Sequence, residues 1–227
     1  MIEPDGKDHV CEMCGECCMN GSPTLHLSDF KLFEDNVVTM NDVYTLRNGE
    51  LVYDNVGEEI DHLKNEMIKI KEAPGSKTCI FYEPESRNCG IYDKRPLQCV
   101  YFECWNPKKF FETMNEEKLK RDDLFYRLPV IKEIINAHED KCSHKKISDL
   151  FKKVEDGDEA AADDILEILQ YDTEIRPLIS KNMNIPEESM DLILGRSLVS
   201  TMFTFGYKVE VDDKGNHFLT LDKPPKE

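Results

Sequence analysis

The sequence predicts an α+β fold: an irregular, cysteine-rich N-terminal part with short strands and a hairpin, then a mainly helical C-terminal part that ends in a β-hairpin. Two observations predict this class. Eight of the nine cysteines lie between Cys11 and Cys104, and apolar spacing near 3.6 residues begins only at Pro107. We therefore expect a cysteine-rich domain over 1–106 and a helical region over 107–227, which can pack together as one unit.

The first part contains short elements with local signals. Ser28 in "LSDFKLFEDN" is a candidate N-cap for a short helix. Asn48-Gly49 in "DVYTLRNGELVYDN" predicts a hairpin, because both residues tolerate a positive φ. "MIKIKE" alternates as a strand does, with "CIFYEP" as its expected partner. Pro96 is expected as the first helical residue of "RPLQCVYFECW".

Five segments of the second part have helical spacing. They are 107–123, 128–141, 145–156, 158–170 and 186–206. Gly157 separates two of them, and Pro186 is expected at the first position of the last. The final segment, "YKVEVDDKGNHFLTLD", predicts the closing hairpin.

Charge and hydropathy exclude two classes of partner. The formal net charge of −17 repels phosphate backbones, so we expect no nucleic-acid partner. The least polar long stretch, 192–207, is too short to span a bilayer and contains Arg196, so we expect no membrane association. The first residues lack the basic and apolar regions of a signal peptide, which predicts a cytoplasmic protein with reduced thiols.

The cysteine spacing indicates metal ligation. An odd number of cysteines in a chain of this length argues against a disulfide framework. In "CEMCGECC", Cys11, Cys14 and Cys17 recur every third residue, and Gly15 permits the close turn that would direct three sulfurs to one centre. Further ligands must then come from elsewhere. The candidate metal ligands are Cys11, Cys14, Cys17, Cys18, Cys79, Cys89, Cys99 and Cys104.

Two kinds of metal centre fit this ligand set. Zinc accepts four thiolates in a tetrahedron. An iron–sulfur cluster also takes four cysteines, and C-x2-C-x2-C opens one ferredoxin motif. The ferredoxin continuation is absent because Cys18 directly follows Cys17, and the second C-x2-C pair of a zinc ribbon is also absent. The spacing slightly favours iron–sulfur, most simply [4Fe-4S] in one or two centres, with zinc as the alternative.

The cysteine motifs resemble the YkgJ-type cysteine-cluster family of zinc- or iron-chelating proteins. That family has C-x2-C-G-x-C-C, a later cysteine before an apolar pair, and C-x-I-Y-x-x-R-P-x-x-C. The matching residues are Cys11, Cys14, Gly15, Cys17, Cys18, Cys79, Ile80, Phe81, Cys89, Ile91, Tyr92, Arg95, Pro96 and Cys99. Cys104 and Trp105 in "FECW" resemble a subset of the family. The resemblance covers about the first 105 residues and implies metal binding more firmly than any reaction.

Two further residues are candidates for contact with the cofactor. Arg95 can offset the negative charge of a metal bound by four thiolates and donate hydrogen bonds to sulfur, or it can form an ion pair with Asp93. Tyr92 can shield a cluster from water, or it can belong to an ordinary core. Cys142 and His144 are a possible but disfavoured additional ligand pair.

The sequence contains no phosphate-binding loop, G-x-S-x-G or H-E-x-x-H motif, so no catalytic residue is predicted and enzymatic activity is left open. The preferred hypothesis is an iron–sulfur protein that transfers electrons, or carries or assembles clusters, as part of a redox or cluster-maturation complex with protein partners. The first alternative is a zinc-stapled adaptor that binds another protein. The second is part of a methylase-like enzyme that modifies protein side chains, since flagellin lysine methylases contain a related cluster.

Overall fold

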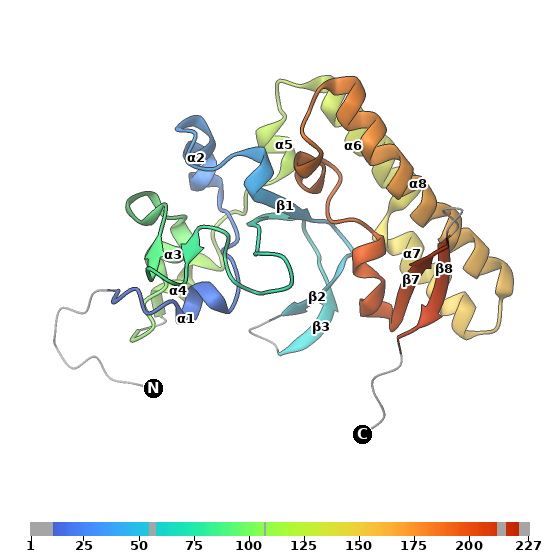
Figure 1. Ribbon diagram of the computed structural model, residues 1–227, viewed down its shortest axis with the longest axis horizontal. Helices are drawn as coiled ribbons and strands as arrows, with labels where there is room; N and C mark the ends of the chain where they lie inside the picture. The colour runs from blue at the N-terminus through green and yellow to red at the C-terminus, as the bar shows by residue number, and fades with distance from the viewer. Residues whose placement is uncertain (1–10, 55–57, 107, 213–216, 223–227) are drawn as a thin grey trace. The chain divides into compact units, whose positions relative to one another are not determined.

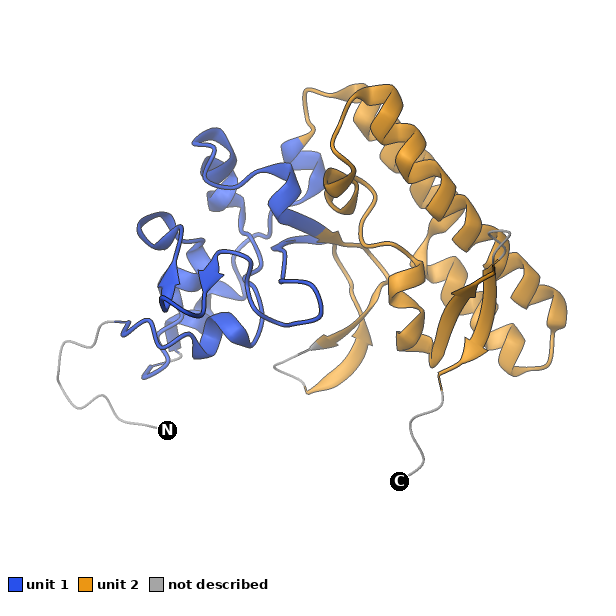
Figure 2. Ribbon diagram, viewed as in Figure 1, with its two compact units in different colours: residues 1–44, 67–124 blue, residues 45–66, 125–227 orange. Residues whose placement is uncertain are grey.

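The computed structural model describes residues 11–54, 58–106, 108–212 and 217–222. The chain forms two compact units, which Figure 2 shows in different colours. Unit 1 contains residues 1–44 and 67–124, and unit 2 contains 45–66 and 125–227. The units do not follow a single division of the chain, and the boundary at residue 106 stays a prediction. Across the described ranges, no helix combines the length and apolar character that a membrane crossing requires.

Unit 1 is built from short elements (Figure 1). Its helices are α1 (Glu16–Met19), α2 (Phe30–Glu34), α3 (Leu97–Tyr101), α4 (Lys108–Thr113) and α5 (Arg121–Leu124), with 3-10 turns η1 (Leu27–Asp29), η2 (Met40–Asp42) and η3 (Tyr92–Lys94). Its strands are β4 (Met67–Ile70), β5 (Tyr82–Glu83) and β6 (Asn88–Cys89). Strand β1 (Val43–Leu46) continues from unit 1 into unit 2.

The core of unit 1 is held by backbone bonds between three distant segments. Leu25 N–H donates to Ile68 O (2.8 Å), Ile68 N–H to Leu119 O (3.2 Å), and Leu119 N–H to Leu25 O (3.0 Å). All three side chains are 0% exposed. Burying a leucine or isoleucine stabilises the fold by about 1.5–3 kcal/mol, so this small cluster fixes the scaffold on which the cysteine segments lie.

Unit 2 contains the longer elements. They are β2 (Leu51–Asp54), β3 (Glu59–His62), α6 (Pro129–Cys142), α7 (His144–Glu155), α8 (Glu159–Met183), η4 (Glu187–Ser189), α9 (Met190–Ile193), η5 (Val199–Phe205), β7 (Tyr207–Val211) and β8 (His217–Leu221). Among the described residues the strands form two-stranded sheets, in the pairs β1–β4, β2–β3, β5–β6 and β7–β8. The predicted α+β class, with a mainly helical second part and a closing hairpin, is confirmed.

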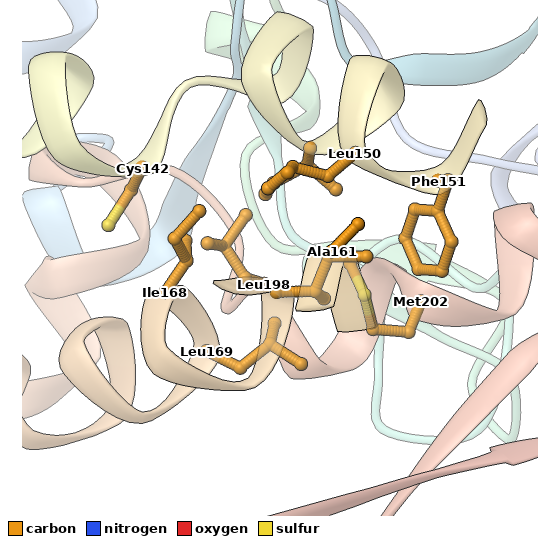
Figure 3. Close-up of a cluster of buried hydrophobic side chains, with 10 residues drawn as sticks. Cys142, Leu150, Phe151, Ala161, Ile168, Leu169, Leu198 and Met202 are labelled. Atoms are coloured by element: carbon orange, nitrogen blue, oxygen red, sulfur yellow. The ribbon is translucent and has the colours of Figure 1, made fainter. Parts of the chain in front are cut away.

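The helices of unit 2 begin where their sequences provide a start. Pro129 is in the first turn of α6, Ser143 Oγ accepts a hydrogen bond from Lys146 N–H at the start of α7, and Asp158 accepts one from Ala160 N–H at the start of α8. Their apolar faces share one core with η5. Its buried members are Cys142, Ile147, Leu150, Phe151, Ala161, Ile165, Ile168, Leu169, Leu198 and Met202. Figure 3 shows these side chains meeting between the helices.

A charged network is buried inside unit 2. Arg47 (0% exposed) donates from Nη1 to His138 Nδ1 (3.3 Å) and from Nη2 to His144 Nε2 (3.1 Å). His138 Nε2 lies 2.8 Å from Asp172 Oδ1. This pattern assigns a neutral His138, which accepts at Nδ1 and donates at Nε2. The segment before β2 is thereby bonded to α6, α7 and α8.

Two carboxylates balance the arginines of this network. Asp172 accepts bonds from Arg176 Nε (3.0 Å) and Arg176 Nη2 (2.9 Å). Glu50, 1% exposed, accepts bonds from Arg47 N–H (2.8 Å) and Arg196 Nε (2.8 Å). Burial alone would raise the pKa of Asp172, but the hydrogen bond from His138 and the charge of Arg176 hold it below its usual value.

The predicted pairing around Asn48-Gly49 is wrong. A turn does form there, because Glu50 N–H donates to Arg47 O (3.1 Å). However, β1 pairs with β4, and β2 pairs with β3 in the register Leu51↔His62 to Asp54↔Glu59. The strand at "MIKIKE" is confirmed as β4 over its first four residues. Its last two residues meet the expected partner "CIFYEP", through a Glu72↔Cys79 bridge and a bond from Ile80 N–H to Lys71 O (3.1 Å).

The helical part also departs from the periodic pattern in three places. The segment 107–123 contains two short helices, α4 and α5, rather than one. The segment 186–206 is divided into η4, α9 and η5, and Gly195, with a left-handed φ of 79°, lies in the break between α9 and η5. Helix α8 instead continues past its expected end, through Pro177, to Met183.

The predicted helix starts are displaced by one or two residues. Ser28 lies inside η1, whose N-cap is His26. Pro96 and Pro186 are the N-cap residues of α3 and η4 rather than their first helical residues. Displacements of this size are usual at helix ends, where the last turn frays.

Candidate metal centre

The first cysteine motif forms a tight turn and one helical turn. Gly15 has a left-handed φ of 84° and caps α1, and its carbonyl accepts a bond from Met19 N–H (2.8 Å). Cys17 and Cys18 lie on α1 with their sulfurs 3.8 Å apart. Adjacent side chains on a helix usually diverge. Here they remain close enough for both sulfurs to face one small ligand.

The second group of cysteines approaches α1 from three elements of unit 1. Cys79 is buried, and its N–H donates to Cys18 O (2.8 Å), which ties this loop to the end of α1. Cys89 lies on β6, opposite Tyr82 of β5. Cys99 lies on α3 and is half-buried.

Electrostatic interactions indicate that five of these thiols are neighbours. Burial raises the pKa of Cys99, and negative charge on Cys79, Cys17 and Cys89 raises it further. The pKa of Cys79 is raised to about 11, first by burial and then by Cys89 and Cys17 among other groups. For Cys18 the pKa is raised by the hydrogen bond with Cys17, by burial, and by the charges of Cys17, Cys99 and Cys79. Ionising all of them together is therefore unfavourable without a positive charge among them.

Cys17 differs from Cys18, Cys79 and Cys99. Its pKa is lowered to about 6, first by the hydrogen bond from Cys18 and, with a smaller effect, by the charge of Arg95. A thiol with this pKa is largely thiolate at neutral pH, and the thiolate is the form that binds metals. Cys17 is also exposed, so a metal ion can reach it.

The remaining three candidate ligands form a second group around Cys104. Burial raises the pKa of Cys104, followed by the charge of Cys14 and, more weakly, those of Cys17 and Cys11. Cys14 and Cys104 are exposed, and Cys11 is half-buried. All eight predicted ligands thus belong to unit 1, in two groups that share Cys17.

Arg95 and Tyr92 lie together next to the thiols. The guanidinium carbon of Arg95 lies 3.8 Å from the centre of the Tyr92 ring. The charge of Arg95 helps to lower the pKa of Cys17 and offsets part of the rise in the pKa of Cys99. Its Nε is buried and has no hydrogen-bond partner in the described part of the chain. Such an orphaned donor beside several thiols fits a site that is completed by a negatively charged metal–thiolate group.

Tyr82 was not recognised from the sequence as a residue of the site. It is 7% exposed, and its ring occupies the space over Gly15: a Cβ placed on Gly15 would overlap Tyr82 Oη and Cζ and lie 2.8 Å from Cε1. The available signal was its position in "CIFYEP", three residues after Cys79. Burial and the charges of Cys18, Cys14 and Cys17 raise the pKa of Tyr82.

The donor chemistry fits a metal that prefers sulfur. Zinc and iron–sulfur clusters both take thiolate ligands. Within the ranges that the structure describes, no group of three or more His, Cys, Asp or Glu side chains is arranged to hold a metal ion. The identity of the ligands therefore stays a prediction, although all eight belong to the same unit.

A comparison with protein families matches residues 10–124 to the family CxxCxxCC, described as "Putative zinc- or iron-chelating domain". This match spans half of the chain, all the predicted ligands and both cofactor-contact candidates. The chain belongs to the CxxCxxCC family. The resemblance to the YkgJ-type cysteine-cluster proteins is thereby confirmed. No curated protein and no solved structure matched the chain.

The CxxCxxCC region continues beyond the last predicted ligand, Cys104, to the end of unit 1. It includes α4 and α5, which the sequence had assigned to the helical region. Cys142 lies outside it, in the core of unit 2, where burial raises its pKa to about 12. His144 also lies outside it and accepts a hydrogen bond from Arg47.

Proposed function

We propose that unit 1 binds an iron–sulfur cluster through its cysteines and uses it to transfer electrons to, or deliver clusters to, a protein partner. Membership in a zinc- or iron-chelating family supports metal binding in general. The observation that carries the proposal is that contacts join the cysteine segments of unit 1. Cys79 N–H donates to Cys18 O (2.8 Å), and Tyr82 lies opposite Cys89 and packs on Gly15. Elements distant in the sequence would then be joined through one inorganic group, most simply [4Fe-4S], in one centre or two.

The charge of the surroundings supports such a group. Thiolate-bound clusters are anionic, and Arg95 supplies a positive charge and an unpartnered N–H beside Cys17 and Cys99. The Tyr92 ring under the guanidinium limits its motion. Arg95 would donate to a thiolate or sulfide, and hydrogen bonds of this kind raise the reduction potential of a cluster.

The exposure of the ligands supports exchange with a partner. Cys14, Cys17 and Cys104 are exposed, whereas Cys79 is buried. A cluster held in this way would have one edge near solvent, which a partner needs for electron or cluster transfer. With a net charge of −17, the partner is a protein rather than a nucleic acid. We place this chemistry in the cytoplasm, where free thiols stay reduced.

One distance favours a second candidate function, that of a zinc-stapled adaptor. The sulfurs of Cys17 and Cys18 are 3.8 Å apart. In a zinc–thiolate tetrahedron with bonds of about 2.3 Å, two sulfurs are also about 3.8 Å apart. In a [4Fe-4S] cluster the four cysteines serve four iron atoms, so this pair would have to separate or share a different type of centre. Zinc would stabilise the irregular unit and present it to another protein.

Metal analysis of protein purified without oxygen distinguishes the two functions. The iron–sulfur proposal predicts stoichiometric iron and sulfide, with visible absorption that bleaches on reduction. A colourless protein with stoichiometric zinc would replace it by the adaptor. A protein that takes up neither metal would contradict both. The double variant Cys17→Ser/Cys18→Ser should lose the metal, and Cys142→Ala, in the core of unit 2, should keep it.

A further inference from the structure

Tyr82 connects three of the cysteine-bearing segments. Its N–H donates to Cys79 O (3.0 Å), and in the β5–β6 pair it lies opposite Cys89. Its ring packs over Gly15, directly before the helix that carries Cys17 and Cys18. The backbone of Tyr82 is thus fixed by the second cysteine group, while its side chain reaches the first.

We propose that Tyr82 is a positioning residue of the metal centre: its ring, packed on the Gly15 turn, holds Cys17 and Cys18 against the segment that carries Cys79 and Cys89. This inference rests on the proposed function only for the identity of the group that is bound. The contacts of Tyr82 that carry the inference join protein atoms alone, so its positioning role can be measured separately from metal binding.

The contact between Tyr82 and Gly15 requires a ring on one side and a residue without a side chain on the other. Three atoms of the Tyr82 ring system, Oη, Cζ and Cε1, occupy the space that a Cβ of residue 15 would need. Gly15 also has a φ of 84°, which other residues rarely adopt. The tyrosine is 7% exposed, so shortening it to alanine would leave a cavity under the turn. The turn, and the two thiols after it, would then lose the surface against which they are held.

The first test uses metal-free protein and compares rates of thiol alkylation, measured peptide by peptide by mass spectrometry. Tyr82→Ala should increase the alkylation of Cys18 and Cys79 at least about fivefold, while Tyr82→Phe, which keeps the ring, stays within about twofold of the unchanged protein. Tyr53→Ala is the matched control, because Tyr53 is 58% exposed on β2 of unit 2. It should leave the alkylation of these thiols unchanged.

The second test titrates the same variants with zinc or ferrous iron against a competing chelator. Loss of a residue that orients metal ligands typically weakens metal affinity about 10- to 100-fold, and we expect a weakening in this range for Tyr82→Ala and little change for Tyr82→Phe. If Tyr82→Ala matches the unchanged protein in both tests, the proposal is wrong. It is also wrong if Tyr82→Phe is as defective as Tyr82→Ala, since the hydroxyl rather than the ring would then matter.

Folding of the variant is checked independently. Hydrogen exchange at Leu25, Ile68 and Leu119, whose amides bond to one another's carbonyls, reports whether the core of unit 1 persists. If Tyr82→Ala loses that protection, Tyr82→Leu takes its place, because it fills part of the cavity without restoring the ring. If the unchanged protein binds neither metal while alkylation still depends on the ring, the proposed function fails but the positioning role stands.

Discussion

In unit 2, Asp172 is 0% exposed and accepts hydrogen bonds from His138, Arg176 and the Leu198 backbone, whereas in unit 1 burial raises the pKa of the half-buried Cys99 thiol and the charges of Cys79, Cys17 and Cys89 raise it further. Both units take polar groups out of water, and such groups need partners. In unit 2 the Asp172 carboxylate obtains them from its own chain. Unit 1 gathers groups of the same kind, which become good partners only around a cation.

This difference also appears in the size of the elements. Helix α8 of unit 2 has 25 residues, whereas helix α1 of unit 1 has four. Helices this short have little intrinsic stability. We infer that unit 2 is stable without additions and that the cysteine segments of unit 1 depend on a bound metal, a contrast that the following experiments can test.

Removal of the metal should have the largest effect and should be confined to unit 1. Structural zinc contributes roughly 10–16 kcal/mol to folding in small zinc domains. Chelation of metal-loaded protein should therefore increase amide exchange strongly in residues 11–20 and 79–104. The helices α7 and α8 should keep their protection. An equal increase in amide exchange in both units, or no increase in either, would contradict the proposed difference between the units.

The substitution Asp172→Ala should destabilise unit 2 by about 3–5 kcal/mol, because it leaves Arg176 buried without its carboxylate. Chemical denaturation, followed through alkylation of the buried Cys142, would measure this loss. Asp149→Ala is the matched control. Asp149 pairs with Lys152 at 3.6 Å on the surface, so its loss should cost less than about 1 kcal/mol. Similar costs for the two variants would show that the network contributes little.

Acid should destabilise unit 2 through His144. Burial, with the charges of Arg47 and Arg196, lowers the pKa of His144 to about 2 from an ordinary value of 6.5. Between these two values the unfolded chain binds a proton at His144 and the folded unit does not. The free energy of unfolding therefore decreases as the pH falls below 6.5. A single histidine with this shift lowers the free energy of unfolding by about 2–3 kcal/mol between pH 6 and pH 4.

Denaturation curves at several pH values would measure this slope, and His144→Gln should reduce it. His138, which faces Asp172, Arg47 and Arg176, also has a lowered pKa and should account for part of the remaining slope. A slope that His144→Gln leaves unchanged would exclude His144 as its source.

The smallest effect is expected at the start of α7. Ser143→Ala removes the hydroxyl that accepts a bond from Lys146 N–H (3.3 Å) and should cost about 1 kcal/mol. Ser143→Gly should cost only a few tenths, because glycine is tolerated at N-caps. Thermal unfolding would rank the two variants. The reverse order would show that helix capping is not what Ser143 contributes.

The features that could be predicted from the sequence are those encoded locally. The apolar spacing of Ile131, Ile135 and Cys142 predicts α6, and the alternation after Gly206 predicts the closing hairpin. The cysteine spacing predicted a family and a ligand chemistry, because thiols in such numbers have few other uses. The family assignment confirmed the family and supports metal binding in general, while the ligands stay a prediction.

The features that were missed depend on contacts between distant residues. The turn at Asn48-Gly49 forms, but its strands take other partners, because strand pairing is chosen by the rest of the fold. No sequence pattern marks Arg47 as buried; its guanidinium is satisfied by His138 and His144, which are distant in the sequence. In the sequence Tyr82 looks like any core aromatic residue, and only the structure shows that its ring lies on Gly15.

The close approach of Arg47 to Gly195 has an evolutionary consequence. A Cβ at position 195 would lie 2.6 Å from Arg47 Cδ, and the backbone there has a φ of 79°. Glycine is therefore required at position 195 for two reasons, the space that Arg47 occupies and the left-handed backbone, and only the first would lapse in a lineage without the arginine. Descendant sequences that keep Arg47 should keep Gly195, and those that replace the arginine should exchange the glycine only for residues that tolerate a positive φ, such as asparagine.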